Sequence, residues 1–351
     1  MVDELLAAAV DWSGVGGLTG WWVVAPLLES ALMSEVPYDS TLPAARFESR
    51  FHAGDIIDDR YRLVRLLGFG GMGEVWESQH ATLDRPVALK LVRIAGEMRA
   101  RLLHEARLLA SLHHPAIVAV HDAGVTDNEI GYLAMDVLVG ESLASRLQRG
   151  RLAVRDAVVL FIDLLGGLEA AHAAGIIHRD LKPDNVLLVD RGGVNVPVLI
   201  DFGIAVPITP EGVTPDRAGT PVYMAPEQLS GITTERTDVW AACVSLYETM
   251  TGRIPFVGHD LASTLQHVVQ SPLSFPTDVE GLDGKLWAIL TRGLRKDPAD
   301  RTPNVCELRG ALAAWLANKT VAPPTMPPEP TRPRPRSSTF EDLIRKKLTE
   351  G

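Results

Sequence analysis

An acid, a lysine and an amide lie within a few positions of one another near the middle of the chain, as Asp180, Lys182 and Asn185. A carboxylate in such a loop can accept a hydrogen bond from a hydroxyl group and orient it for in-line attack. A nearby ammonium can neutralise negative charge on a phosphoryl group as that group moves. The amide oxygen of Asn185 can bind a metal ion. This combination predicts the transfer of a phosphoryl group to a hydroxyl.

A second acid, Asp201, directly follows the apolar run 196–200, which is typical of a buried strand. Mg²⁺ prefers hard oxygen ligands such as carboxylates and amides, and phosphate oxygens can complete its coordination shell. Asn185 and Asp201 are therefore the expected ligands of Mg²⁺, or of Mn²⁺. The histidines of the sequence lack the ligand cluster that a zinc site requires.

A glycine-rich run, Gly-Phe-Gly-Gly-Met-Gly, occupies residues 68–73. The glycines alone also fit a dinucleotide site or a flexible hairpin. A dinucleotide fold needs a helix straight after the glycines, whereas residues 74–78 continue as a strand. The run therefore predicts a hairpin whose backbone N–H groups can approach a triphosphate closely.

Lys90 stands on the apolar strand expected at 87–93, where an ammonium is costly unless it has a partner. Glu105, on the next expected helix, is the predicted partner. This pair would aim Lys90 at the α- and β-phosphates and would make activity depend on the position of the helix. The alternative is an exposed lysine and an exposed glutamate, since most charged side chains are exposed.

The elements that must position these side chains form one folded region, at 61–316, that is rich in strands first and in helices afterwards. Alternating apolar residues predict strands, and apolar residues at three- and four-residue intervals predict helices. The expected strands cover 61–67, 74–78 and 87–93, and the expected helices cover 97–112 and 154–174, with more helices after 236. A small sheet-rich part thus precedes a larger helical part.

Composition is that of a globular protein, with 46% hydrophobic and 22% charged residues among 351. A net charge of −10 argues against nucleic acid and anionic membranes as partners, because their binders cluster Lys and Arg. The two cysteines, Cys243 and Cys306, have no paired spacing, so neither a disulfide framework nor a zinc site is expected. A reducing cytoplasm fits this pattern.

The two ends of the chain differ from the folded region. Residues 12–28 are uncharged but are interrupted by glycines and a proline, whereas a membrane-spanning helix needs about 20 apolar residues, so membrane insertion is not expected. Residues 319–337 are dense in proline, which disfavours helices and central strands. A short helix at 338–348, or a frayed end in its place, could follow.

Taken together and in this order, the glycine run, the strand lysine, the acid–lysine–amide loop and Asp201 resemble the signatures of eukaryotic-like (Hanks-type) serine/threonine protein kinases, in particular bacterial ones. The resemblance implies a bilobal α+β protein-kinase fold with an antiparallel-sheet small lobe and one long helix at 55–135, a hinge at 136–140 and a larger, mainly helical lobe at 141–316. An extension of unclear structure, 1–54, would precede the domain. A mostly disordered proline-rich tail, 317–351, would follow it.

The resemblance also implies roles for individual residues. Asp180 would be the catalytic base, Lys182 the loop lysine typical of serine/threonine specificity, and Thr220 a contact of both. Met135 would lie at the back of the adenine pocket, next to a hinge whose backbone binds the base. The implied nucleotide-binding residues are Leu67, Gly68, Phe69, Gly70, Gly71, Met72, Gly73, Val75, Ala88, Lys90, Glu105, Met135, Asp136, Leu138 and Leu187.

Two further matches and one departure complete the resemblance. Glu227 would form a buried structural ion pair with Arg301. Arg179, which precedes the catalytic acid, would bind a phosphate on Thr209 or Thr214, so we expect autophosphorylation that orders this loop. Cys243 stands where the family usually has a glycine, so an altered local helix packing is expected.

The predicted activity is that of a non-specific serine/threonine protein kinase, which transfers the γ-phosphoryl of ATP to protein hydroxyls in bacterial signal transduction. The expected partners are protein substrates and ATP, and a homodimer would allow phosphorylation in trans. A pseudokinase scaffold is one alternative, although it would normally have lost the lysine, the acid or a metal ligand. A small-molecule kinase is another, although such relatives generally lack a peptide-binding segment like 219–227.

Overall fold

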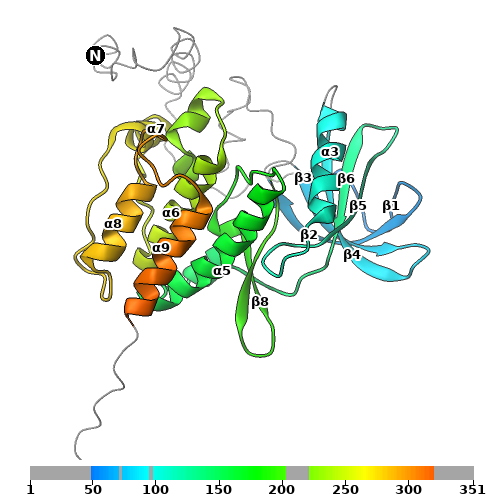
Figure 1. The fold of residues 1–351 in the computed structure, drawn as a ribbon. Coiled ribbons are helices and arrows are strands. Elements are labelled where there is room, and N and C mark those ends of the chain that lie inside the picture. Colours follow the sequence, from blue (N-terminus) through cyan, green and yellow to red (C-terminus); the bar gives the residue numbers. More distant parts are fainter. Residues whose placement is uncertain (1–48, 71–72, 95–97, 203–220, 320–351) are drawn as a thin grey trace, which may run out of the picture. The chain divides into compact units, whose positions relative to one another are not determined.

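The computed structural model describes residues 49–70, 73–94, 98–202 and 221–319. The extension before residue 49, the expected helix at 338–348 and the predicted residues Gly71, Met72, Thr209, Thr214 and Thr220 lie outside these ranges. The described chain forms a sheet-rich small lobe and a helical large lobe, as Figure 1 shows on its right and left sides. The predicted α+β fold is confirmed.

The small lobe is built on a six-stranded antiparallel sheet with the strand order β1-β2-β3-β4-β6-β5. Helix α3, Met98–Ser111, contacts β5 and β6 and lies close to the expected range. Register pairs Val75 with Lys90 and Ala88 with Met135, so neighbouring strands present these residues on one face. The strands are β1 (Ile56–Ile57), β2 (Tyr61–Gly70), β3 (Gly73–His80), β4 (Arg85–Arg93), β5 (Val120–Val125) and β6 (Ile130–Met135).

β2 ends and β3 begins within the glycine-rich run, and the two strands pair antiparallel with Gly70 opposite Gly73. The predicted hairpin is therefore confirmed, and the dinucleotide alternative is wrong. A side chain at Gly73 would overlap the carbonyl oxygen of Leu91, so close packing of the hairpin on β4 requires glycine there.

The large lobe is organised around two buried helices, α5 (Val154–Ala173) and α6 (Glu235–Thr251). One face of α5 carries Val158, Leu165 and Leu168, whose side chains are fully buried, and these residues belong to the apolar spacing that predicts a helix at 154–174. α6 is buried along nearly its whole length and ends at Gly252, which has a φ of 71°.

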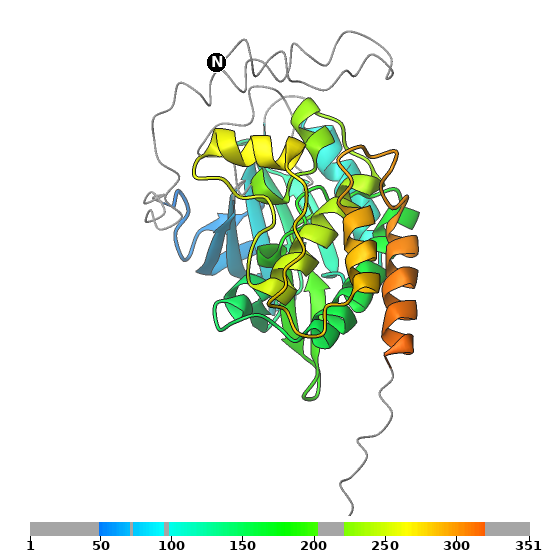
Figure 2. The ribbon, with the colours of Figure 1, turned by 90° about the vertical axis from the view of Figure 1, so that its left-hand side faces the viewer.

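The other elements of the large lobe surround these two helices. A three-stranded sheet with the order β7-β8-β9 lies beside the hinge, and α9 runs next to α5, as both views show (Figure 1, Figure 2). None of the helices in the described ranges is long and apolar enough to cross a bilayer. The elements are β7 (Gly140–Ser142), α4 (Leu143–Leu147), β8 (Val186–Asp190), β9 (Asn195–Leu199), α7 (Leu261–Gln270), α8 (Gly284–Gly293) and α9 (Val305–Asn318).

Cys243 lies on α6 with a fully buried side chain, and burial raises the pKa of its thiol to about 12. It faces Gly293 at the end of α8, where an added Cβ would overlap the sulfur. Gly293 therefore provides the room that the thiol needs. The altered helix packing expected at Cys243 is thus a close contact between its thiol on α6 and Gly293 on α8.

Candidate active site

The acid, the lysine and the amide of the central loop converge in space. The loop connects α5 to β8 and includes one short 3₁₀ turn, Pro183–Asn185. Lys182 Nζ lies 2.9 and 3.1 Å from the carboxylate oxygens of Asp180. Asn185 Nδ2 donates to the Asp180 carbonyl oxygen at 2.7 Å and to its Oδ2 at 3.0 Å. The carboxylate is therefore held between a cation and an amide, in a position to accept from a hydroxyl.

The backbone of this loop is held by Asp238, a fully buried carboxylate on α6. It accepts hydrogen bonds from the backbone N–H groups of His178 and Arg179, at 2.8 and 2.9 Å, and from His172 Nε2 at 2.7 Å. Sequence reasoning missed this residue. The available signal was an acid directly before the apolar run 239–244 of α6, since a buried carboxylate needs donors.

The side chain of His178 packs against Phe202, with 4.6 Å between the ring centroids. Complete burial lowers the pKa of His178, although Asp238, Asp180 and Asp201 act in the opposite direction. The ring is thus a neutral packing group that links the loop to the segment after β9.

The expected ion pair between Lys90 and Glu105 is wrong for this structure. Lys90 Nζ is in contact with the carboxylate of Asp201, and Glu105 accepts from Arg179 Nη1 at 3.0 Å. Each of the four charged groups therefore has an oppositely charged neighbour, but Asp201 takes the place of Glu105 beside Lys90, and Arg179 takes the place of Lys90 beside Glu105. The physical reason is that Lys90 is only 7% exposed and takes the nearest carboxylate, while Arg179 offers Glu105 a planar donor from the other lobe.

Arg179 and Asp201 also share an unusual backbone conformation, with φ values of 69° and 59°. The left-handed region is strained for residues other than glycine, and such strain is concentrated at functional sites. Arg179 directly precedes Asp180, and Asp201 follows Ile200, which is hydrogen-bonded to Asn185 of the same loop, so the strain marks the same site that the side chains indicate.

The two candidate metal ligands lie close together in the fold. Ile200 N donates to the carbonyl oxygen of Asn185 at 3.0 Å, which joins the chain just before Asp201 to the end of the loop. Because Nδ2 of Asn185 is bonded to Asp180, its side-chain oxygen is the atom available to a metal. An amide oxygen and a carboxylate fit the preference of Mg²⁺ for hard oxygen ligands.

Most of the residues predicted to line the adenine pocket lie on adjoining strands. Ala88 and Met135 are paired and buried, Val75 lies on the neighbouring strand, and Leu187 comes from β8 in the large lobe. Leu67 is 41% exposed on β2. Only the backbone is described at Phe69 and Gly70, and they close the β2–β3 hairpin together with Gly68.

The hinge follows the last residue of β6. Asp136 N donates to the carbonyl oxygen of Ala119 at 3.0 Å, and the Asp136 carboxylate lies 2.6 Å from His121 Nε2. Val137 and Leu138 are half-buried and continue toward β7. His121 thus has a structural carboxylate partner rather than a metal-binding neighbourhood.

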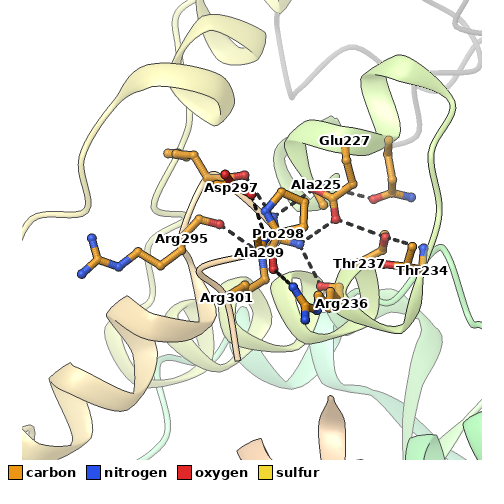
Figure 3. A network of polar contacts seen from close by, with 12 residues as sticks. Ala225, Glu227, Thr234, Arg236, Thr237, Arg295, Asp297, Pro298, Ala299 and Arg301 are labelled. Carbon is orange, nitrogen blue, oxygen red and sulfur yellow. Dashed lines mark hydrogen bonds and ion pairs between the residues drawn. The ribbon is translucent and has the colours of Figure 1, made fainter. Parts of the chain in front are cut away.

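The segment after residue 220 is fixed to the large lobe by Glu227 and Arg301. The two side chains are almost completely buried and form paired hydrogen bonds of 2.6 and 2.9 Å. Arg301 also donates to the backbone carbonyl oxygens of Arg236, Arg295 and Lys296. Figure 3 shows this network, which satisfies all parts of the guanidinium group.

Proteins that are similar to this chain in sequence are protein kinases. A family model described as protein kinase domain matches residues 61–348. The chain is 36% identical to the serine/threonine-protein kinase PknA of Mycobacterium tuberculosis over 298 residues, and the matched region covers 80% of this chain and 67% of PknA. It is 38% identical to the serine/threonine-protein kinase PknE of Mycobacterium bovis over 265 residues, and the matched region covers 73% of this chain and 46% of PknE. The chain therefore belongs to the protein kinase family, as a Hanks-type serine/threonine protein kinase of the bacterial kind that uses ATP and Mg²⁺.

Proposed function

We propose that Asp180 is the residue that orients the hydroxyl of a protein serine or threonine for attack on the γ-phosphoryl group of ATP. The observation that carries this proposal is the bonded group of Asp180, Lys182 and Asn185, in which the carboxylate is held from two sides. ATP supplies the phosphoryl group, and Mg²⁺ offsets negative charge on the phosphates. Lys182 stabilises charge that develops on the transferred group, and Asn185 and Asp201 hold the metal.

The test replaces Asp180 with asparagine, which keeps the shape and removes the acceptor charge. We expect kcat on a protein substrate to fall by at least about 100-fold, as for loss of a general base, while binding of a fluorescent ATP analogue is retained. Asp184→Asn is the matched control, because Asp184 is exposed in the same loop. Equal activity of Asp180→Asn and the wild type would refute the assigned base.

The same experiment separates the two alternatives. A pseudokinase scaffold predicts that the wild type and Asp180→Asn are equally inactive on every substrate but bind the same partners. A small-molecule kinase predicts phosphate transfer to a metabolite and none to protein. Neither alternative is favoured by the intact set of Lys90, Asp180, Asn185 and Asp201.

We further propose that the exchanged ion pairs are the resting arrangement of a switch. In this arrangement Arg179 holds Glu105, so Glu105 does not bond to Lys90. A phosphate on Thr209 or Thr214 would compete for the guanidinium of Arg179, because hydrogen bonds from arginine to phosphate are strong and bidentate. Glu105 would then be released to pair with Lys90, which would aim the lysine at the phosphates of ATP.

The switch is tested by mass mapping and kinetics of a Thr209→Ala, Thr214→Ala double variant. We expect loss of phosphate from this loop and a lower kcat than that of the phosphorylated wild type. Unchanged loop phosphorylation together with unchanged activity would contradict the proposal. Dephosphorylated wild type is the control, and it should match the double variant.

We propose that phosphorylation of the loop occurs in trans, within a transient homodimer in the cytoplasm. Both cysteines carry free thiols, which supports a reducing compartment. Purified wild type should phosphorylate Asp180→Asn protein at Thr209 or Thr214, at a rate that increases with concentration. Absence of label on the inactive variant would refute transfer in trans.

A further inference from the structure

A pocket of about 190 Å³ lies where the last turn of α5 meets the first turns of α6 and α9. Five side chains with hydrogen-bonding atoms line it: Glu169 and His172 from α5, Glu235 from α6, Asn304 directly before α9, and Cys306 from α9. None of them belongs to the transfer site described above. Helices α5, α6 and α9 lie next to one another in the large lobe (Figure 1).

His172 lines this pocket, and its buried Nδ1 lies on the side of Glu235, which lines the pocket as well. Its side chain is only 4% exposed, and Nε2 is bonded to Asp238. Asp238 also accepts from two backbone N–H groups, so it is a carboxylate, and Nε2 of His172 must be the donor in this bond. In the neutral ring, Nδ1 is then an acceptor. Nδ1 has no hydrogen-bond partner among the described residues, and the nearest charged atom is Oε2 of Glu235, at 3.9 Å.

Among the other polar groups of the pocket, Asn304 is bonded through Oδ1, which accepts from Glu307 N at 2.9 Å, and two others are carboxylates. Glu235 contributes a half-exposed carboxylate. Glu169 accepts from Arg309 at 2.9 Å, and its hydrogen bond with Cys306 raises the pKa of that thiol. The pocket therefore offers a lone pair and a carboxylate to an occupant that donates hydrogen bonds and carries positive charge.

A metal ion fits this pocket less well. Across the part of the chain that the structure describes, no three histidine, cysteine or acidic side chains converge as a metal site requires. We propose instead that the pocket binds a guanidinium or primary ammonium group, which donates to His172 Nδ1 and to the carboxylate of Glu235.

Binding there would reach the catalytic loop through one residue. His172 bonds to Asp238, and Asp238 holds the backbone N–H groups of His178 and Arg179, directly before the catalytic acid. An occupant that fixes the His172 ring therefore steadies the position of Asp180 without touching ATP. The binding step does not depend on the proposed roles in transfer, whereas the effect on rate rests on them.

The experiment titrates the full chain, labelled with ¹⁵N-histidine, with agmatine, which carries both cationic groups. We expect a saturable change in the Nδ1 resonance of His172, with a Kd of ~1 mM, as for a ligand with few heavy atoms. Glu235→Gln should weaken binding at least about fivefold through loss of the charge. Glu307→Gln, an equal charge change on α9 outside the pocket, should leave binding unchanged.

A second titration with an acetylated and amidated Gly-Arg-Gly peptide identifies the source of the cation. Tighter binding of the peptide than of agmatine indicates a protein side chain, and the reverse indicates a small metabolite. If neither probe shifts His172, or if Glu235→Gln binds as well as the wild type, the site is refuted. In kinetics, saturating agmatine should raise kcat at least about twofold at constant KM for ATP, and unchanged kcat would refute the link to the loop.

Discussion

Replacing Glu227 with glutamine should cause a large and measurable loss of stability. The substitution keeps the volume and removes one charge of the buried pair, so Arg301, whose side chain is fully buried, loses its counter-charge. Breaking a buried ion pair by removing one partner typically costs 3–5 kcal/mol. Three backbone carbonyls still accept from Arg301, at 2.9 to 3.3 Å, so we expect the lower part of that range, about 3 kcal/mol.

The assay is thermal unfolding of the purified full chain, followed by circular dichroism and calorimetry. At roughly 2–4 °C per kcal/mol for a domain of this size, the predicted decrease in Tm is about 6–12 °C. Glu307→Gln is the control, because its 3.9 Å contact with Arg292 joins two exposed side chains and is worth about 1 kcal/mol at most. A Tm for Glu227→Gln within about 2 °C of the wild type would show that the network in Figure 3 does not stabilise the fold as reasoned.

Further substitutions test the packing around the loop and the contact between α6 and α8. Burial lowers the pKa of His178, so as the pH falls the unfolded chain is protonated at this ring before the folded chain is. The free energy of unfolding should therefore decrease below about pH 6.5, by up to ~1.4 kcal/mol per pH unit. His178→Phe removes the titrating group and should flatten the profile of Tm between about pH 6.5 and 5. Asp238→Asn should lower kcat roughly tenfold with little change in KM for ATP, measured by steady-state kinetics, because the amide keeps one acceptor oxygen and places an NH2 donor against the other loop N–H group. Gly293→Ala should destabilise by about 1–3 kcal/mol through overlap with Cys243, and adding Cys243→Gly should restore the free energy of unfolding in denaturant titrations; simple additivity would contradict this contact.

Much of the architecture could be predicted because it depends on local patterns. The apolar spacing of residues 154–174 gave α5 to within one residue, and the strand after the glycines distinguished a hairpin from a dinucleotide fold. The bonded group of Asp180, Lys182 and Asn185 was also predictable, since its members are close in sequence and share one short loop.

Partners that are far apart in the sequence were harder to predict. The choice of Lys90 between Glu105 and Asp201 depends on the relative position of two lobes, which no local pattern encodes. Asp238 was missed because its role as an acceptor appears only when the chain some 60 residues earlier folds back onto α6. The contact between Cys243 and Gly293 likewise depends on how α6 and α8 approach each other.

Because the backbone is strained at Arg179 and Asp201, selection for stability and selection for activity should favour different residues at these two positions. A non-glycine residue held at positive φ costs of order 1–3 kcal/mol, a sizeable fraction of the 5–15 kcal/mol by which a typical domain is stable. Glycine at either position would relax the backbone but remove a guanidinium or a carboxylate that the site uses. A library screened only for heat resistance should therefore accept substitutions here that a screen for phosphate transfer rejects, and comparison of the two screens would map where this enzyme gives up stability for function.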